Sequence, residues 1–115
     1  MYKYYINFNT YNDISTISIV KIKLDVEEKP NSYKLLNSYG GRILKNKLDI
    51  PSGYNDEYIY SLEDNIEKYG ELLINEYKRK LDNELQTQIR YCENAENCLK
   101  LFNNAMSNVN YKEEN

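Results

Sequence analysis

The chain has 115 residues, enough for one domain with a real core and too few for two. Its net charge of −3 argues against general affinity for nucleic acid, and no apolar run approaches the length that spans a bilayer. The absence of histidine excludes the commonest general base, nucleophiles paired with histidine, and histidine-ligated metal sites. We therefore expect a protein that is not an enzyme.

The charge is unevenly distributed along the chain. Through Ser61 the sequence has eight Lys and Arg against seven Asp and Glu, whereas the remainder has seven against eleven. The first half is nearly neutral and the second half is acidic. An anionic ligand is therefore expected near a local basic cluster.

The sequence also bears on cellular location. Residues 2–5 follow Met1 without the apolar stretch of a secretory signal, so we expect a cytoplasmic protein. Cys92 and Cys98 lie six positions apart on one expected helix, about 240° apart around its axis, and we expect two free thiols. Abundant Asn and Tyr without Trp are typical of an AT-rich genome, such as that of a low-GC bacterium or its phages.

Up to Ser61, apolar residues alternate at period two, as half-buried strands require. Five strands are predicted, at residues 2–9, 14–26, 32–39, 42–50 and 57–60. Polar, Gly or Pro turn sequences separate them, including Gly40-Gly41 as a tight hairpin. Because each connection is short, we expect an antiparallel meander.

The second predicted strand changes phase partway along. Ile17 and Ile19 share one parity, whereas Val20 and Ile22 share the other. A β-bulge near Ile19-Val20 would reconcile the two phases. A strand buried on both faces is the other interpretation.

After Ser61, apolar residues recur every three or four positions without proline, which predicts helix through residue 107. Ser61-Leu62-Glu63-Asp64 has the form of a capping box and predicts that the helix begins at Ser61. Four residues keep the seven-residue spacing of a coiled-coil seam: Leu85, Cys92, Leu99 and Met106.

An unbroken helix of this length would extend about 65 Å, far beyond what a small sheet covers. We expect either a break near Asn94 or Asn97, which gives two helices, or contact with another subunit. Residues 108–115 are expected to form a flexible tail. The predicted fold is α+β: a single domain of residues 1–115, with an antiparallel sheet of about five strands over 1–60 and one long or two helices over 61–107.

Five residues are candidates for ligand binding: Arg42, Lys45, Tyr58, Tyr60 and Arg90. Arg42 and Lys45 belong either to a charged face that protects an edge strand or to a surface that contacts phosphate. Tyr58 and Tyr60 alternate on one face, either as cross-strand pairs or as stacking partners for a nucleobase. Arg90 is either a surface arginine or an anchor in a pocket between protomers. No metal or cofactor is expected.

Two segments, Tyr39-Gly40-Gly41-Arg42-Ile43-Leu44-Lys45 and Tyr58-Ile59-Tyr60-Ser61-Leu62-Glu63, precede the long acidic helical part. With that order of elements, the chain resembles small phage anti-defence proteins, and among them the Thoeris anti-defence sponge family. The resemblance implies a homo-oligomer joined through its C-terminal helices that binds and sequesters a cyclic ADP-ribose-type or cyclic nucleotide immune signal. It also implies that Arg42 and Arg90 line pockets between protomers, with Tyr58 or Tyr60 stacking on the ligand.

Two other functions remain open from the sequence. The first is a protein-binding inhibitor of a host defence protein, of anti-CRISPR type, whose acidic helix imitates nucleic acid; the eleven acidic residues after Ser61 suggest it. The second is a structural or assembly subunit of a phage or mobile element. In each case we expect no direct binding of nucleic acid and no membrane association.

Overall fold

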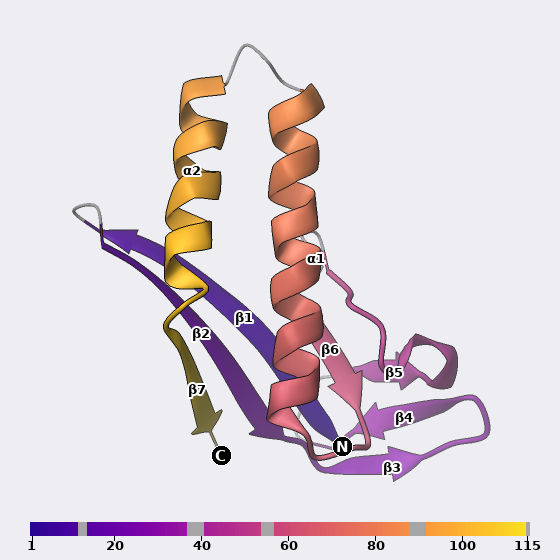
Figure 1. The fold of residues 1–115 in the computed structure, drawn as a ribbon. Coiled ribbons are helices and arrows are strands. Elements are labelled where there is room, and N and C mark those ends of the chain that lie inside the picture. Colours follow the sequence, from indigo (N-terminus) through magenta and orange to yellow (C-terminus); the bar gives the residue numbers. More distant parts are fainter. Residues whose placement is uncertain (12–13, 37–40, 54–56, 88–91, 115) are drawn as a thin grey trace.

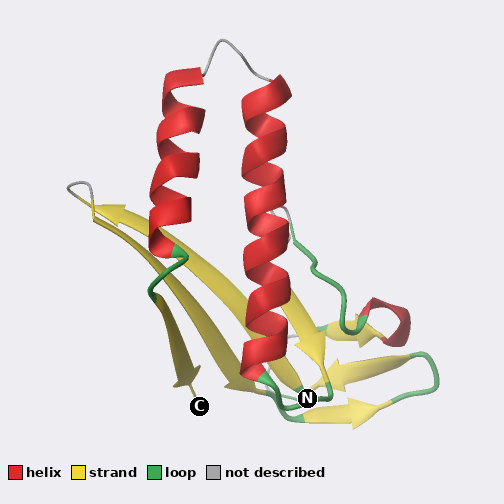
Figure 2. Ribbon diagram, viewed as in Figure 1, coloured by secondary structure: helices red, strands yellow, loops and turns green. Residues whose placement is uncertain are grey.

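The structure, a computed structural model, describes residues 1–11, 14–36, 41–53, 57–87 and 92–114. It confirms the α+β class: the described strands form two sheets, and a helical hairpin covers one face of the larger sheet (Figures 1 and 2). The elements in chain order are β1 (Tyr2–Tyr11), β2 (Ile14–Lys23), β3 (Val26–Glu28), β4 (Ser32–Leu35), β5 (Arg42–Leu44), the 3-10 helix η1 (Lys45–Lys47), β6 (Tyr58–Ser61), α1 (Ile66–Thr87), α2 (Cys92–Ala105) and β7 (Val109–Glu114).

The larger sheet has the strand order β6-β1-β2-β7, and the smaller sheet has the order β3-β4-β5. The predicted single meander is therefore wrong. The long strand predicted over 14–26 divides after Lys23, and the strand predicted over 42–50 ends at Leu44, where η1 begins. β6 then pairs antiparallel with β1 instead of with β5. Gly40 of the predicted hairpin lies outside the described residues.

β2 is buried on both faces, so the bulge predicted near Ile19-Val20 is wrong. β1 and β2 pair without interruption, with Ile6 opposite Ile19 and Tyr5 opposite Val20. Ile19 belongs to the core cluster under the helices, whereas Val20 points to the opposite face and is also buried. Val20 lies between Tyr5 of β1 and Lys112 of β7 in the strand register, two long side chains that flank it.

The flexible tail predicted for 108–115 is wrong for Val109–Glu114, which forms β7 and pairs in parallel with β2. An ion pair that the local sequence did not reveal favours this pairing. The ammonium of Lys21 on β2 lies 2.7 Å from Glu113 and 2.7 Å from Asp64, and only 12% of its side chain is exposed. Hydrogen bonds to these two carboxylates raise the pKa of Lys21.

The helical part divides into two helices, one of the two arrangements expected. The position expected for the break, near Asn94 or Asn97, is wrong: α1 ends at Thr87, α2 begins at Cys92, and both asparagines lie within α2. The chain folds back, so α1 and α2 pack side by side (Figure 1). The side chains of Leu85 and Cys92 in the predicted coiled-coil seam lie outside the described residues. None of the described helices is long and apolar enough to cross a membrane.

Aromatic rings form the core between the helices and the larger sheet. Phe102 of α2 is fully buried, stacks on Tyr77 of α1 at 5.2 Å and meets Phe8 of β1 edge-on at 5.1 Å. Gly70 allows α1 to approach the sheet closely, since a Cβ there would lie 3.0 Å from Tyr111 and 3.1 Å from Ile19. The packing explains why a glycine is accepted inside a helix.

Phe102→Ala is expected to lower the free energy of unfolding by about 3–5 kcal/mol, because it leaves a cavity where two aromatic rings lose their partner. Urea denaturation followed by circular dichroism measures the change. Leu62→Ala is the control: Leu62 is exposed, and its loss is expected to cost less than about 0.5 kcal/mol. Equal effects of the two substitutions would contradict this assignment of the core.

Candidate functional site

A groove of about 740 Å³ lies between the smaller sheet and β6. We call it the tyrosine groove. Its described lining includes two cations, Arg42 and Lys47, and two aromatic rings, Tyr58 and Tyr60, with apolar side chains between them. Leu44 and Ile50 belong to this apolar lining, yet 50% and 49% of their surfaces are exposed. Exposed apolar side chains beside a concave surface are typical of a binding site.

The two cations give the groove its chemical character. Arg42 is the first residue of β5, and Lys47 is the last residue of η1. Among the residues that the structure describes, neither side chain forms an ion pair. A guanidinium and an ammonium near one apolar groove can bind an anionic group, with the guanidinium able to donate two parallel hydrogen bonds.

Tyr58 and Tyr60 lie on the face of the sheet that the helices do not cover. Their rings meet edge-on at 5.4 Å, and the ammonium of Lys3 lies 5.0 Å and 5.8 Å from the two ring centroids. Tyr58 also borders a smaller hollow of about 260 Å³ that includes Lys3 and Glu57. Both rings are half-buried, and burial raises the pKa of the Tyr60 hydroxyl. The Tyr60 hydroxyl therefore remains protonated, and the two rings offer flat faces on which a planar ligand can stack.

Residues 50–53 form one wall of the groove, and the segment 48–53 follows the outer side of β6 (Figure 1). The amide of Asp49 donates to the carbonyl of Tyr60 at 2.8 Å, and the amide of Ser52 donates to that of Tyr58 at 2.8 Å. Gly53 has a φ of 97°, and a Cβ there would lie 2.8 Å from the Tyr58 ring. The glycine thus allows the segment to pass close to Tyr58.

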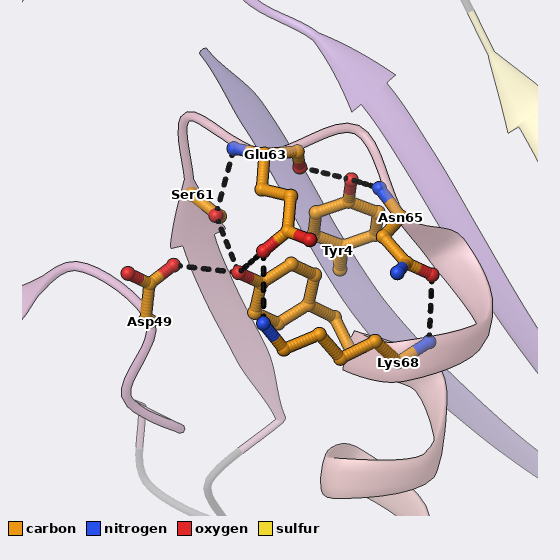
Figure 3. A network of polar contacts seen from close by, with 7 residues as sticks. Tyr4, Asp49, Ser61, Glu63, Asn65 and Lys68 are labelled. Carbon is orange, nitrogen blue, oxygen red and sulfur yellow. Dashed lines mark hydrogen bonds and ion pairs between the residues drawn. The ribbon is translucent and has the colours of Figure 1, made fainter.

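A buried hydroxyl holds this wall in place from the other side of β6. Tyr69 of α1 is 2% exposed, and its hydroxyl lies 2.9 Å from carboxylate oxygens of both Asp49 and Glu63 (Figure 3). The phenol has one hydrogen, which these two acceptors share, while Ser61 donates to the phenol oxygen at 2.9 Å. Burial, together with the hydrogen bonds to the two carboxylates, raises the pKa of Tyr69.

The same network determines where α1 begins, and it corrects the predicted capping box. Ser61 is the last residue of β6, and its buried hydroxyl accepts from the amide of Glu63. Asn65 caps α1 instead, because its side-chain oxygen accepts from the amide of Lys68 at 3.1 Å. The hydroxyl of Tyr4 fixes the turn by accepting from the Asn65 amide and donating to the Glu63 carbonyl (Figure 3).

The carboxylate of Glu63 is the charged member of this network. The ammonium of Lys68 donates to it at 2.9 Å, and Tyr69 contacts the same oxygen. These hydrogen bonds, that from Lys68 first, lower the pKa of Glu63. The network stabilises the turn between β6 and α1, and through Asp49 it positions the segment that forms the groove wall. None of the network's members lines the tyrosine groove.

Three of the five candidate residues lie together: Arg42, Tyr58 and Tyr60 line the tyrosine groove. Lys45 does not line it. Its ammonium pairs with Glu28 at 2.8 Å and lies 5.3 Å from the ring centroid of Tyr33. Arg90 lies outside the described residues, so its predicted place in a pocket between protomers stays a prediction.

Two cations near the tyrosines were not among the candidates. Lys47 lines the groove because η1 replaces the predicted strand and turns the chain after Leu44. The basic character of the segment from Arg42 to Lys47 was a usable signal for it. Lys3 lies opposite Tyr60 in the register of β1 and β6, and no local sequence pattern reveals that pairing.

Within the described ranges, no group of three or more His, Cys, Asp or Glu residues gathers to hold a metal ion. Cys98 is a free thiol. The groove itself offers cationic, aromatic and apolar contacts. Contacts of these kinds can bind and orient a small ligand.

Comparison of the chain with protein-family models, with curated proteins and with solved structures yields no match.

Glu63→Gln is expected to destabilise the protein at pH 7 and to have progressively less effect as the pH falls. The lowered pKa of Glu63 means that its carboxylate stabilises the fold above the ordinary carboxyl range, and that this contribution is lost as the pH falls through the lowered value. Urea midpoints of both proteins between pH 7 and pH 3 measure the difference. A difference independent of pH would contradict the role assigned to the Glu63 carboxylate.

Proposed function

We propose that this chain is a non-catalytic protein that binds a small anionic ligand with a planar aromatic group in the tyrosine groove. The observation that carries the proposal is that Arg42, Lys47, Tyr58 and Tyr60, from three separate elements, line one groove. A nucleotide needs both kinds of contact, because its phosphate is anionic and its base has flat faces.

The dimensions and composition of the groove support a ligand of this size. Its volume of about 740 Å³ lies within the range of small-molecule sites, roughly 300–1,000 Å³. Apolar side chains such as Leu44 and Ile50 supply area for burial, and the two cations of the lining are candidates to contact phosphate. Tyr58 and Tyr60 supply rings for the base.

A cyclic ADP-ribose-type or cyclic nucleotide signal is the ligand class that we propose. The resemblance to phage anti-defence sponges suggests this class, and a groove that binds without chemistry suits sequestration. On this proposal the protein acts in the cytoplasm of a bacterial host by lowering the free concentration of an immune signal.

The proposed oligomer rests on different grounds. The helical part folds back as a hairpin, so the length of the helices no longer requires a second subunit. A homo-oligomer through the C-terminal helices remains part of the proposal because the resemblance implies it, and Leu72 of α1 is an exposed apolar residue on this hairpin. Native mass spectrometry measures the oligomeric state and any retained ligand in one experiment.

Calorimetric titration with cyclic ADP-ribose isomers and cyclic dinucleotides is expected to detect binding of at least one of them. Arg42→Ala should then weaken the affinity about tenfold or more, because it removes a charge-assisted hydrogen bond. Tyr58→Leu should weaken it by a similar factor through the loss of stacking.

The matched controls are Lys45→Ala and Tyr33→Leu, which remove a nearby cation and a nearby ring that do not line the groove. Both should bind like the unmodified protein. The proposal is wrong if no compound in the panel binds, or if the control substitutions weaken binding as much as those in the groove.

A further inference from the structure

β7 forms one edge of the larger sheet, and its outer side is open within the described part of the chain. It pairs with β2 on one side, and no described strand pairs with it on the other (Figure 1). The opposite edge of the sheet is different, because the segment 48–53 hydrogen-bonds to the outer side of β6. An open edge strand presents unpaired amides and carbonyls to any extended chain that reaches it.

A groove of about 510 Å³ lies beside this edge, between α1 and the face of β7 that the helices cover. We call it the β7 groove. Val109, Tyr111 and Met106 contribute its apolar surface, and 47% of Tyr111 is exposed. The ring of Tyr111 lies against α1 at Gly70, which leaves its remaining surface facing the groove.

The rim of the β7 groove is acidic. Glu67 and Glu71 are one helical turn apart on α1, both are exposed, and both line the groove. No described lysine or arginine lines it. The groove therefore combines an apolar floor with an unneutralised negative rim, the complement of a long basic side chain.

We propose that β7 is a docking edge for an extended peptide segment of a partner protein that has Arg or Lys at every second residue. The segment adds to β7 as a further strand through backbone hydrogen bonds, so its alternate side chains point toward the helices. The stem of a basic residue then lies on Tyr111, and its charged end meets Glu67 and Glu71.

Charge argues for this occupant over a second copy of the chain. Two β7 edges brought together would place the acidic rims of both protomers along one shared edge. The chain as a whole also carries a net charge of −3, which favours a basic partner at this edge.

The test uses a fluorescein-labelled peptide of eight residues in which Arg alternates with Thr, measured by fluorescence anisotropy with the full chain. Three peptides of equal charge are compared with it. One has its four Arg in a block. The other two carry N-methyl groups on alternate amides, one in each register, so that each has a different edge blocked. We expect the alternating peptide to bind about tenfold more tightly than the block peptide. It should exceed by a similar factor the methylated peptide whose blocked edge faces β7.

Variants of the protein assign the binding to the β7 groove. Glu67→Gln with Glu71→Gln is expected to weaken binding of the alternating peptide about three- to tenfold, because two partly exposed ion pairs are lost. Glu27→Gln with Glu28→Gln is the matched control, since it removes the same charge from the edge strand of the smaller sheet. Hydrogen exchange of the β7 amides should slow when the alternating peptide is added.

Several results would overturn the proposal: no binding at millimolar peptide, equal binding of the block peptide and of both methylated peptides, or equal losses in the two double variants. A dimer of the free protein whose β7 amides are already protected would assign this edge to a second copy and would also overturn it. Each of these results is independent of ligand binding in the tyrosine groove, which lies beside β6.

Discussion

The hydroxyl of Tyr69 is a polar group buried between the helices and the sheet, and such a group is costly unless it is hydrogen-bonded. Its partners come from three places in the chain: Ser61 at the end of β6, Glu63 in the turn before α1, and Asp49 in the segment after η1. Satisfying one phenol therefore fixes where β6 ends, where α1 begins and where the 48–53 segment lies. Asp49 even adopts a φ of 63°, which is uncommon for a residue with a side chain.

The sequence predicted which kinds of secondary structure form better than it predicted where each element begins and ends. Period-two and helical spacing gave the α+β class, because each side chain on a half-buried element must face either the core or solvent. The capping-box interpretation of Ser61 failed because that hydroxyl is engaged by Tyr69, eight residues further on. The prediction of a flexible tail where β7 forms failed for a related reason. Its stabilising partner, Lys21, is distant in the sequence and its own residues are polar.

The candidate site was predictable only in part. Arg42, Tyr58 and Tyr60 could be selected as residue types that bind anions and bases, yet their meeting depends on a chain path that local patterns do not encode. That path turns at η1, where a strand was predicted, and returns along β6 through backbone hydrogen bonds. The turn explains why Lys47 reaches the groove while Lys45 pairs with Glu28.

The two edges of the larger sheet differ in how they are protected and in charge. At β6, the 48–53 segment satisfies backbone groups of the edge, and the adjacent groove is lined by Arg42 and Lys47. At β7, no described segment covers the edge, and the adjacent groove is rimmed by glutamates. Open edges invite pairing, and exposed charged side chains restrict which chains can pair. On the proposed docking mode, the acidic character of the C-terminal half has a structural consequence: it would disfavour another acidic chain at β7 while leaving the backbone of this edge available for pairing.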